Sequence, residues 1–513
     1  MNNSRKAIIL AGFPLEISVD NFKPATRSLS SQAYFLTHFH SDHYGGLDST
    51  FPWMQDETKK LYCSTITSAL VKNILAIPAN RIISLEFGIT FKIQFKTSIE
   101  LLVTMIPANH CPGAAQILFE YQDILTKKIK RVLHCGDCRF DSSMKLNEAL
   151  LEAKKGGGID EVFLDTTYAK AKHVFPSQSQ SINMALQIVS ECMTPDSVSL
   201  TNNLLLKDLS KDNASYAISD ADKSAATATT TKSSIPSSII SSSAAIPFAD
   251  TDKVLILIST YNVGKERLIL SIARTFGLRI FAPPRRIKTL SLLGINETDM
   301  KYFTTDRSKA SIHIVSMSFL ASTFPYIMPN FDNLNHYLES MNKQLKSSSY
   351  LGHDTDDDAI TFISGAQSNQ SIVPESSKRY NRIFGILSTG WCESLKEVKD
   401  KTSTTSLYTI PYSEHSSYSE LHEYVSFLKP VLITPTVFSD EKDFIRIRND
   451  FAKDTNQTEA KRSFISLFSK KSSSSSSSSK NVVTIVDDDV IEVVEVEPKK
   501  RKIVQTKLQS WFT

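Results

Sequence analysis

Short apolar runs recur along the chain and predict strands. In the first 170 residues they lie at 101–106, 129–133 and 161–164. A glycine triplet at 156–158 marks the turn before the third run. A longer buried-strand run at 254–258 precedes a helix-like stretch at 266–276, and strands and helices resume from 382 to about 437. The pattern predicts strands alternating with loops first, and further strands and helices later in the chain.

Polar segments separate these runs. Two stretches rich in Ser, Ala, Thr and Asp bury too little apolar surface to fold, so we expect disordered insertions at about 207–252 and about 346–377. From 446 onward the chain contains eight consecutive serines at 472–479. We expect this last segment to be an unfolded tail that carries short binding motifs.

Composition narrows the class of protein. The 513 residues are 41% hydrophobic and 22% charged, which suits about three folded domains. There is no run of eighteen apolar residues and no signal-peptide core near the N-terminus, so we expect neither a membrane span nor secretion. Six cysteines do not form a disulfide framework in so long a chain, which favours a reducing compartment. The net charge of +4 decides nothing about nucleic acid.

The strongest chemical signal is the sequence His38-Phe-His40-Ser-Asp42-His43. In an extended segment, residues two apart point to the same side, so His38 and His40 can bind one cation together. Asp42 and His43 follow where the chain turns and face a second position nearby. The alternative, a polar surface loop that happens to contain histidines, is disfavoured by the specific spacing.

Two further candidates follow predicted strands. His110 comes after the 101–106 strand, and Asp137 comes after the 129–133 strand. Taken alone, each is more often an ordinary polar residue, but rigid strand ends deliver side chains to fixed places. Together they fit a centre in which Asp137 bridges two metals about 3.5–4 Å apart, which hold a hydroxide and clamp a phosphodiester.

Two neighbouring patterns have simpler explanations. Cys135 and Cys138 have C-x-x-C spacing, but no second pair completes a zinc ribbon. We favour small residues beside the metal loop over a zinc or redox pair. Gly264-Lys265 lacks the upstream glycine of a phosphate-binding loop, so we reject nucleotide binding there.

A series of motifs between about residues 15 and 440 reads HFHSDHYGGL, PANHCPGA, HCGDCRFD, LDTTY, TYNVGKER, STGW and PYSEHSSYSELHEYV. In this order they resemble the DNA cross-link repair nucleases, relatives of Artemis and Apollo, and are most similar to the interstrand cross-link repair 5′-exonucleases. The resemblance implies an α/β fold, a metallo-β-lactamase αββα sandwich with an inserted β-CASP domain. The implied parts are a first lactamase segment at 1–174, the insertion at 175–380, a return segment at 381–445 and the tail at 446–513.

The resemblance also implies a ligand set. A first zinc would be bound by His38, His40, His110 and Asp137. A second zinc, for which Mg²⁺ or Mn²⁺ is an alternative, would be bound by Asp42, His43, Asp137 and His415. The implied catalytic aspartates are Asp42, Asp137, Asp20 and Asp165, of which Asp20 orients the histidine loop and Asp165 opens the insertion.

DNA and its 5′-phosphate have their own candidate residues. These are Tyr168, Lys265, Ser413 and Ser416, which lie in the family motifs. Val437 stands where RNA-processing relatives carry a histidine, which favours DNA over RNA.

The implied function is a metal-dependent 5′-to-3′ DNA exonuclease of interstrand cross-link repair. A metal-bound hydroxide would attack the phosphodiester, with Asp42 orienting or deprotonating the water. Alternatives are a telomere-end or hairpin-processing nuclease of the same family, a small-molecule metallo-hydrolase, and a scaffold that binds DNA without cleaving it. The long insertion between Asp165 and His415 argues against the small-molecule enzyme, and the presence of every expected ligand argues against the scaffold.

The tail carries short motifs that predict partners. A basic cluster resembles a nuclear import signal and predicts a nuclear protein: Lys499, Lys500, Arg501 and Lys502. The aliphatic run 483–486 before the acids 487–489 resembles a SUMO-interacting motif. A third motif resembles the box that docks onto the replication sliding clamp, and it consists of Gln505, Leu508, Trp511 and Phe512. We expect DNA with a 5′-phosphate as substrate, no membrane partner and a monomer.

Overall fold

The computed structural model describes residues 7–8, 10, 12–95, 99–193, 254–322, 326–350, 380–401 and 404–456. The polar insertion expected at 207–252 and every tail motif lie outside these residues. The first residues of the second polar insertion, expected at about 346–377, belong to helix α10 (Phe331–Tyr350), and the rest of it lies outside the described residues. The elements expected from the apolar runs are confirmed as β7 (Glu100–Pro107), β9 (Ile129–His134), β10 (Glu161–Leu164), β11 (Val254–Ser259) and α6 (Glu266–Phe276).

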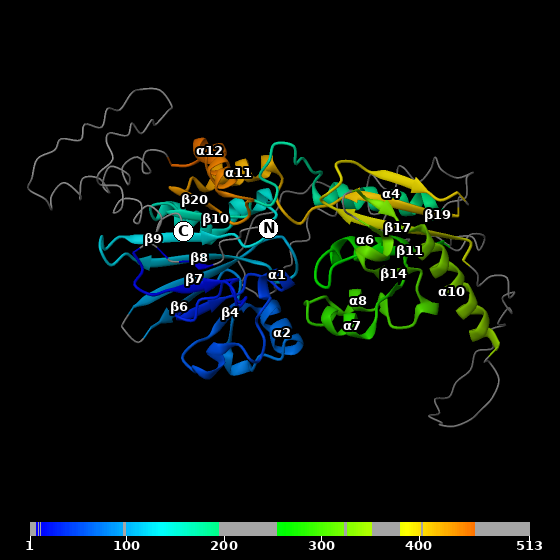
Figure 1. Ribbon diagram of the computed structural model, residues 1–513, viewed down its shortest axis with the longest axis horizontal. Coiled ribbons are helices and arrows are strands. Elements are labelled where there is room, and N and C mark those ends of the chain that lie inside the picture. Colours follow the sequence, from blue (N-terminus) through cyan, green and yellow to red (C-terminus); the bar gives the residue numbers. More distant parts are fainter. Residues whose placement is uncertain are drawn as a thin grey trace, which may run out of the picture. The chain divides into compact units, whose positions relative to one another are not determined.

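Two sheets form the part of the fold that carries the histidine motif (Figure 1). The first, in the order β1-β2-β3-β4-β5, consists of β1 (Ala7–Ile8), β2 (Ile17–Val19), β3 (Ala33–Phe35), β4 (Leu61–Ser64) and β5 (Ile82–Leu85). The second has the order β20-β10-β9-β8-β7-β6 and is completed by β6 (Thr90–Gln94), β8 (Ala115–Gln122) and β20 (Leu432–Pro435).

These two sheets share one core and are covered by helices. Phe35 of β3 meets Phe119 of β8 edge to face, with ring centroids 5.0 Å apart. Tyr424 of helix α11 donates a hydrogen bond to Gln116 of β8 at 2.6 Å. The helices of this part are α1 (Ser41–Tyr44), α2 (Thr65–Ile74), α3 (Glu148–Lys155), α11 (Tyr418–Leu428) and α12 (Glu441–Phe451), of which α2 packs on β4 and β5 and α12 on β20. This layering confirms the αββα sandwich.

Strand β20 returns the chain to the sandwich. It pairs in parallel with β10, and Ile433 lies opposite Val162. Figure 1 shows α11, α12 and β20, drawn in orange, beside the cyan strands of the first half. The sandwich is therefore built from both ends of the described chain.

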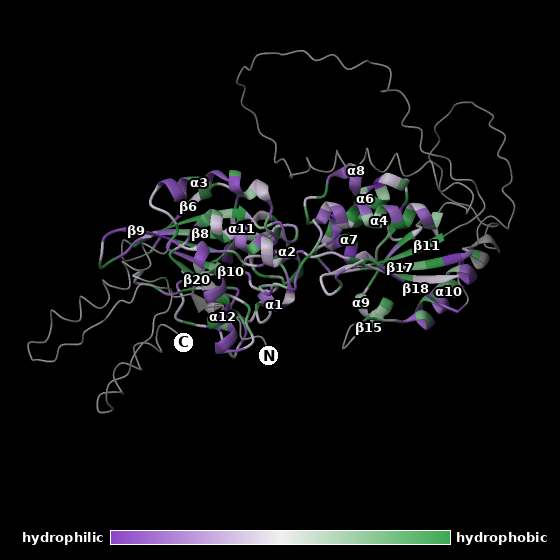
Figure 2. Ribbon diagram, turned by 90° about the horizontal axis from the view of Figure 1, so that it is seen from above, coloured by the Kyte–Doolittle hydropathy of each residue, from purple (hydrophilic) through white to green (hydrophobic). Residues whose placement is uncertain are grey.

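A seven-stranded sheet occupies the sequence between these two ends. Its order is β13-β12-β14-β11-β17-β19-β18, with β12 (Ile280–Phe281), β13 (Phe303–Thr304), β14 (Ile312–Val315), β17 (Arg382–Thr389), β18 (Lys396–Lys399) and β19 (Thr405–Pro411). The remaining elements here are α4 (Gln178–Met193), α7 (Pro284–Leu290), α8 (Glu297–Met300), α9 (Met317–Leu320) and the pair β15 (Ala321–Ser322) and β16 (Met328–Pro329). In Figure 2 the central strands β11 and β17 are coloured as hydrophobic, which agrees with their burial.

This sheet extends past the domain boundary expected at residue 380. Strand β17 pairs with β11, and β19 pairs with β17, so residues 382–411 belong to the inserted sheet. The return segment of the sandwich starts after Pro411, and α12 crosses the tail boundary expected at 446. A local apolar pattern predicts a strand but does not show which sheet the strand joins. Within the described ranges, every helix is too short or too polar to cross a bilayer.

Candidate metal centre

The first candidate ligands lie in the loop that follows β3. His40 has extended backbone angles, φ −106° and ψ 147°, and it precedes the single turn of α1 that carries Asp42 and His43. Asp20, just after β2, holds the loop. Its carboxylate accepts hydrogen bonds from the backbone N–H and the hydroxyl of Thr37 at 2.8 and 2.6 Å. These two hydrogen bonds suit the role expected for Asp20, which is to orient the histidine loop.

Three histidines have their outer ring nitrogens in hydrogen bonds to oxygen atoms. The pairs are His40 Nε2 with the carbonyl of Val263 (2.8 Å), His110 Nδ1 with the carbonyl of Glu414 (2.8 Å) and His38 Nδ1 with the hydroxyl of Thr37 (3.0 Å). Each acceptor needs a proton from the ring, since the hydroxyl of Thr37 already gives its own proton to Asp20. Each neutral ring therefore keeps its lone pair on the inner nitrogen.

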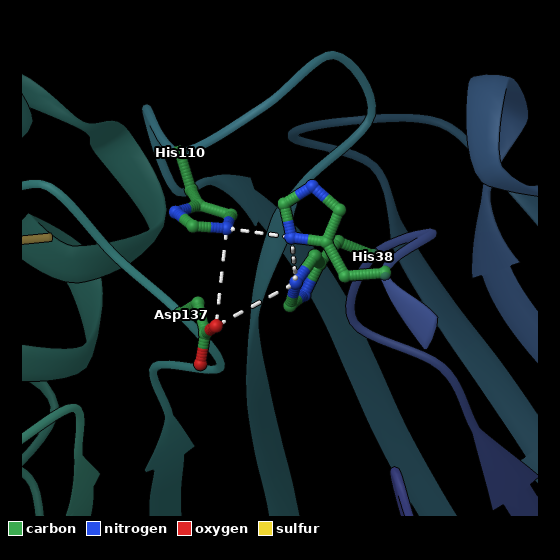
Figure 3. A group of neighbouring side chains, drawn as sticks. His38, His110 and Asp137 are labelled. Atoms are coloured by element: carbon green, nitrogen blue, oxygen red, sulfur yellow. Dashed lines mark hydrogen bonds and ion pairs between the residues drawn. The ribbon is translucent and has the colours of Figure 1, made fainter. Parts of the chain in front are cut away.

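The inner nitrogens converge near Asp137. His40 Nδ1 lies 3.0 Å from His38 Nε2 and 3.1 Å from His110 Nε2. Asp137 Oδ2 lies 3.6 Å from His38 Nε2 and 3.8 Å from His110 Nε2. Figure 3 shows His38, His110 and Asp137 pointing toward one another from separate loops. The loops after β3, β7 and β9 thus bring four donor atoms together.

This donor set fits a divalent cation. Burial holds the pKa of His38 and His110 well below the ordinary histidine value and lowers the pKa of His40, so the rings are neutral. Three inward lone pairs about 3 Å apart repel one another unless a cation or proton lies between them. Three imidazoles and a carboxylate also supply the tetrahedral N and O ligands that zinc accepts. His38, His40, His110 and Asp137 can therefore hold one metal ion together.

A second group shares Asp137. His43 Nε2 lies 3.1 Å from Asp137 Oδ2 and 3.5 Å from Asp42 Oδ2, while His43 Nδ1 is held by Asp20 at 2.8 Å. Burial lowers the pKa of His43, but the carboxylates of Asp137 and Asp20 outweigh it and raise the pKa to about 10. Burial likewise opposes ionisation of Asp137, yet the charge on His43 holds its pKa well below the usual range. The site therefore favours positive charge, which a proton supplies in the absence of a cation.

His415 lies in a different group from the one expected. Its Nδ1 lies 2.8 Å from Asp165 Oδ2, and its possible metal-binding group joins it to Asp137 and Asp165. Within the described chain, no such group contains His415 together with Asp42 or His43. Asp165 also accepts the backbone N–H of Cys138 at 2.9 Å, so it fixes both His415 and the Asp137 loop. Whether His415 binds the second cation stays a prediction.

A cavity of about 680 Å³ opens over the donor atoms. Its walls include Tyr168, Lys265 and Ser413, which are expected to contact DNA. Lys265 is buried, and its ammonium group donates to the carbonyl of Ser388 at 2.5 Å. Burial lowers the pKa of Lys265 to about 8, although the carboxylate of Glu414 opposes that shift.

Ser416, also expected to contact DNA, does not line this cavity. Its hydroxyl donates to the carbonyl of Cys138 and accepts from the N–H of Phe140, both at 2.9 Å. These bonds tie the return segment to the Asp137 loop, which is a structural role. Cys135 and Cys138 of that loop are free and buried, and burial raises the pKa of both thiols. This supports small packing residues over thiolate ligands.

The sequence alone does not reveal the two backbone carbonyls that orient the candidate ligands. The carbonyl of Val263 accepts a hydrogen bond from His40, and the carbonyl of Glu414 accepts one from His110. Both carbonyls come from segments far along the chain. A carbonyl belongs to every residue type, so no residue pattern reveals it. The TYNVGKER and PYSEHSSY motifs contain these positions, and that is the signal that pointed near them.

Comparison with known proteins agrees with this geometry. Residues 20–196 match the beta-lactamase superfamily domain, and residues 360–441 match the family described as DNA repair metallo-beta-lactamase. DNA ligase 6 of Arabidopsis thaliana is 30% identical over 83% of this chain and 23% of its own length. DNA cross-link repair 1A protein of Homo sapiens is 29% identical over 79% of this chain and 28% of its own length. The 5′ exonuclease Apollo of Gallus gallus is 24% identical over 84% of this chain and 64% of its own length. The chain thus spans about a quarter of the first two relatives and under two thirds of the third.

Proposed function

We propose that this chain is a member of the DNA repair metallo-beta-lactamase family and a metal-dependent DNA exonuclease that digests from the 5′ end and acts in interstrand cross-link repair. The observation that carries the proposal is the convergence of His38 Nε2, His40 Nδ1, His110 Nε2 and Asp137 Oδ2 beneath an open cavity. The names of the relatives, which include DNA cross-link repair proteins and a 5′ exonuclease, supply the substrate and the direction.

The metal ions are part of the proposal. His38, His40, His110 and Asp137 would hold a zinc ion, and Asp42, His43 and Asp137, with His415 as a further candidate, would hold a second zinc, magnesium or manganese ion. Two such cations would neutralise charge at the reacting phosphate and lower the pKa of a nearby water. Elemental analysis of purified protein identifies the metal and its stoichiometry.

The chain itself positions the ligands and the substrate. Asp20 holds the ring of His43 through Nδ1, and it also fixes Thr37 at the base of the histidine loop. Asp42, with a side chain 67% exposed, lies at the cavity wall where it can accept a proton from a water. The Lys265 ammonium and the Tyr168 hydroxyl on the same wall are the groups proposed to bind a 5′-phosphate, together with Ser413.

Digestion of a 5′-phosphorylated single strand tests this function. Purified protein should release mononucleotides, and a chelator should stop the release until zinc or another divalent ion is restored. Products that shorten from the 3′ end would contradict the direction of digestion. Cleavage of a lactam or thioester with no action on DNA would favour the small-molecule hydrolase instead.

The tail motifs supply further proposals. They lie outside the described residues, so their support comes from the sequence alone. We propose nuclear import through Lys499–Lys502, SUMO binding through 483–489, and sliding-clamp binding through Gln505, Leu508, Trp511 and Phe512 in a monomeric protein. A peptide of residues 498–513 should bind the clamp with micromolar affinity and lose that binding when Trp511 and Phe512 become Ala.

A further inference from the structure

Trp391 is the most exposed aromatic residue of the cavity. Its side chain is 76% exposed, although a tryptophan normally buries most of its surface. It follows β17 and lines the same cavity as His40, His110 and Asp137. An exposed indole in the wall of the cavity that contains the candidate metal ligands can serve as a stacking surface for a planar ligand.

The local structure fixes Trp391 from one side. An added Cβ at Gly390 would lie 2.4 Å from the hydroxyl oxygen of Tyr168, so only glycine lets the loop approach this ring. The backbone N–H of Trp391 donates to the hydroxyl of Thr389 at 3.2 Å. The planes of the indole and the Tyr168 ring meet at 72°, with ring centroids 6.2 Å apart. This T-shaped contact steadies the indole, and the 76% exposure of the side chain leaves surface open for stacking.

A second aromatic residue of the cavity is already engaged. Tyr261 is 49% exposed, and the Lys265 ammonium lies 4.5 Å from the centre of its ring. Its ring centroid lies 6.0 Å from that of His40. Of the two exposed aromatic residues that line the cavity, Tyr261 and Trp391, Trp391 therefore has the larger exposed fraction.

We propose that Trp391 stacks against one nucleobase of the DNA end that the cavity holds. The inference rests on the proposed nuclease function and deepens it by naming a base subsite. When a phosphate lies at the donor atoms, the planar, apolar part of the same or the next nucleotide reaches the rim of the cavity. Stacking on an aromatic ring accepts every base, because each base has a π face. The subsite therefore binds a base turned out of its own stack, without selecting its identity.

The test compares DNA ends with and without a base. The substrates are 5′-phosphorylated single strands with A, C, G, T or an abasic residue as the first nucleotide, and a second set varies the next nucleotide. The proteins are the unaltered chain, Trp391→Ala, Trp391→Phe and the control Tyr326→Ala, which removes another aromatic side chain that is 76% exposed but does not line the cavity. The measured quantity is kcat/KM.

We expect the unaltered protein to treat the four bases alike and to lose about tenfold on the abasic end at one of the two positions. Trp391→Ala should lose about tenfold in kcat/KM on normal ends, because the base then has no ring to stack on. On abasic ends it should match the unaltered protein, because those ends have no base to stack. Trp391→Phe should retain most of the activity, and Tyr326→Ala should behave like the unaltered protein.

Two results would overturn the inference. One is an abasic penalty of the same size in Trp391→Ala as in the unaltered protein, which means an equal loss on normal and abasic ends and would assign Trp391 to loop shape. The other is no penalty at either position in the unaltered protein. Failure of the unaltered protein to cleave any of these strands would contradict the nuclease function instead. In that event, fluorescence polarisation of the same strands gives the same comparison for binding alone.

Discussion

The Nε2 atom of His40 lies 2.8 Å from the backbone carbonyl oxygen of Val263, a residue 223 positions later in the chain. Val263 belongs to the loop after β11, so the inserted sheet orients a candidate ligand of the sandwich. Loss of this bond would free the ring to turn or to change tautomer. The insertion is therefore part of the metal centre as well as a wall of the cavity.

Gly264→Ala should weaken the metal centre through this loop. Gly264 has a φ of +118°, and an added Cβ would lie 3.0 Å from a carboxylate oxygen of Glu414. Alanine is strained at this φ and its Cβ crowds Glu414, so we expect the loop to shift and the carbonyl of Val263 to move with it. We expect metal content and activity to fall by about tenfold, as for other losses of ligand support. Elemental analysis and the nuclease assay measure the two quantities.

Gly277→Ala is the matched control. Gly277 also has a positive φ, +64°, but no atom lies within 4 Å of its added Cβ. It should cost some stability at the end of α6 while leaving metal content unchanged. Equal metal loss in both variants would show that general destabilisation, and not the His40 contact, is responsible.

Much of this site was predictable because its side chains carry unusual chemistry in fixed spacings. His38 and His40 have the spacing of a shared ligand pair, His110 and Asp137 follow predicted strands, and the structure brings all four together. The placement of His415 was less predictable, because its partner depends on how the loop after β19 folds back. Its Nδ1 bonds Asp165, and no spacing along the sequence reports a contact across 250 positions.

Asp137→Asn should abolish DNA cleavage while the fold persists. The carboxylate lies within 3.8 Å of nitrogens of His38, His43 and His110, and among the described residues it belongs to three of the groups able to hold a metal. An amide keeps the shape but removes the charge that two dications would share. We expect activity to drop at least about a hundredfold and metal content to fall from two ions toward one or fewer.

Asp48→Asn provides the comparison for that substitution. The Asp48 carboxylate is exposed and accepts hydrogen bonds from the backbone N–H and the hydroxyl of Thr50. It should keep full activity and metal content. Near-normal turnover by Asp137→Asn would mean that the proposed two-metal assignment is wrong.

His415→Ala tests whether the return segment completes the centre. The ring lies 4.8 Å from that of His110 and is held by Asp165. Its removal should lower activity by about tenfold to a hundredfold with an unchanged circular dichroism spectrum. Asp165→Asn should give a smaller loss, because an amide oxygen can still accept from Nδ1.

A second histidine–carboxylate pair separates this effect from a loss of packing. His422 Nδ1 lies 2.5 Å from Asp454 Oδ2, and His422 does not line the cavity. His422→Ala should lower the melting temperature and leave the turnover of the folded protein intact. If His415→Ala behaves in the same way, His415 is a structural residue only.

The preference for 5′-phosphorylated ends should weaken as the pH rises through about 8. Burial lowers the pKa of Lys265 to about 8, while the facing Glu414 carboxylate opposes that shift and Cys392 is the other titratable group acting on it. Below that pH the ammonium is charged and attracts a phosphate, and above it the attraction is lost. The ratio of kcat/KM for 5′-phosphate and 5′-hydroxyl ends, measured from about pH 7.5 to about pH 9.5, reports this titration in the free enzyme.

Lys265→Met should give a low ratio that does not change with pH. Lys288→Met removes an exposed charge on α7 outside the cavity lining, and it should keep the full pH dependence. A ratio that stays constant in the unaltered protein would exclude Lys265 as the phosphate-binding group.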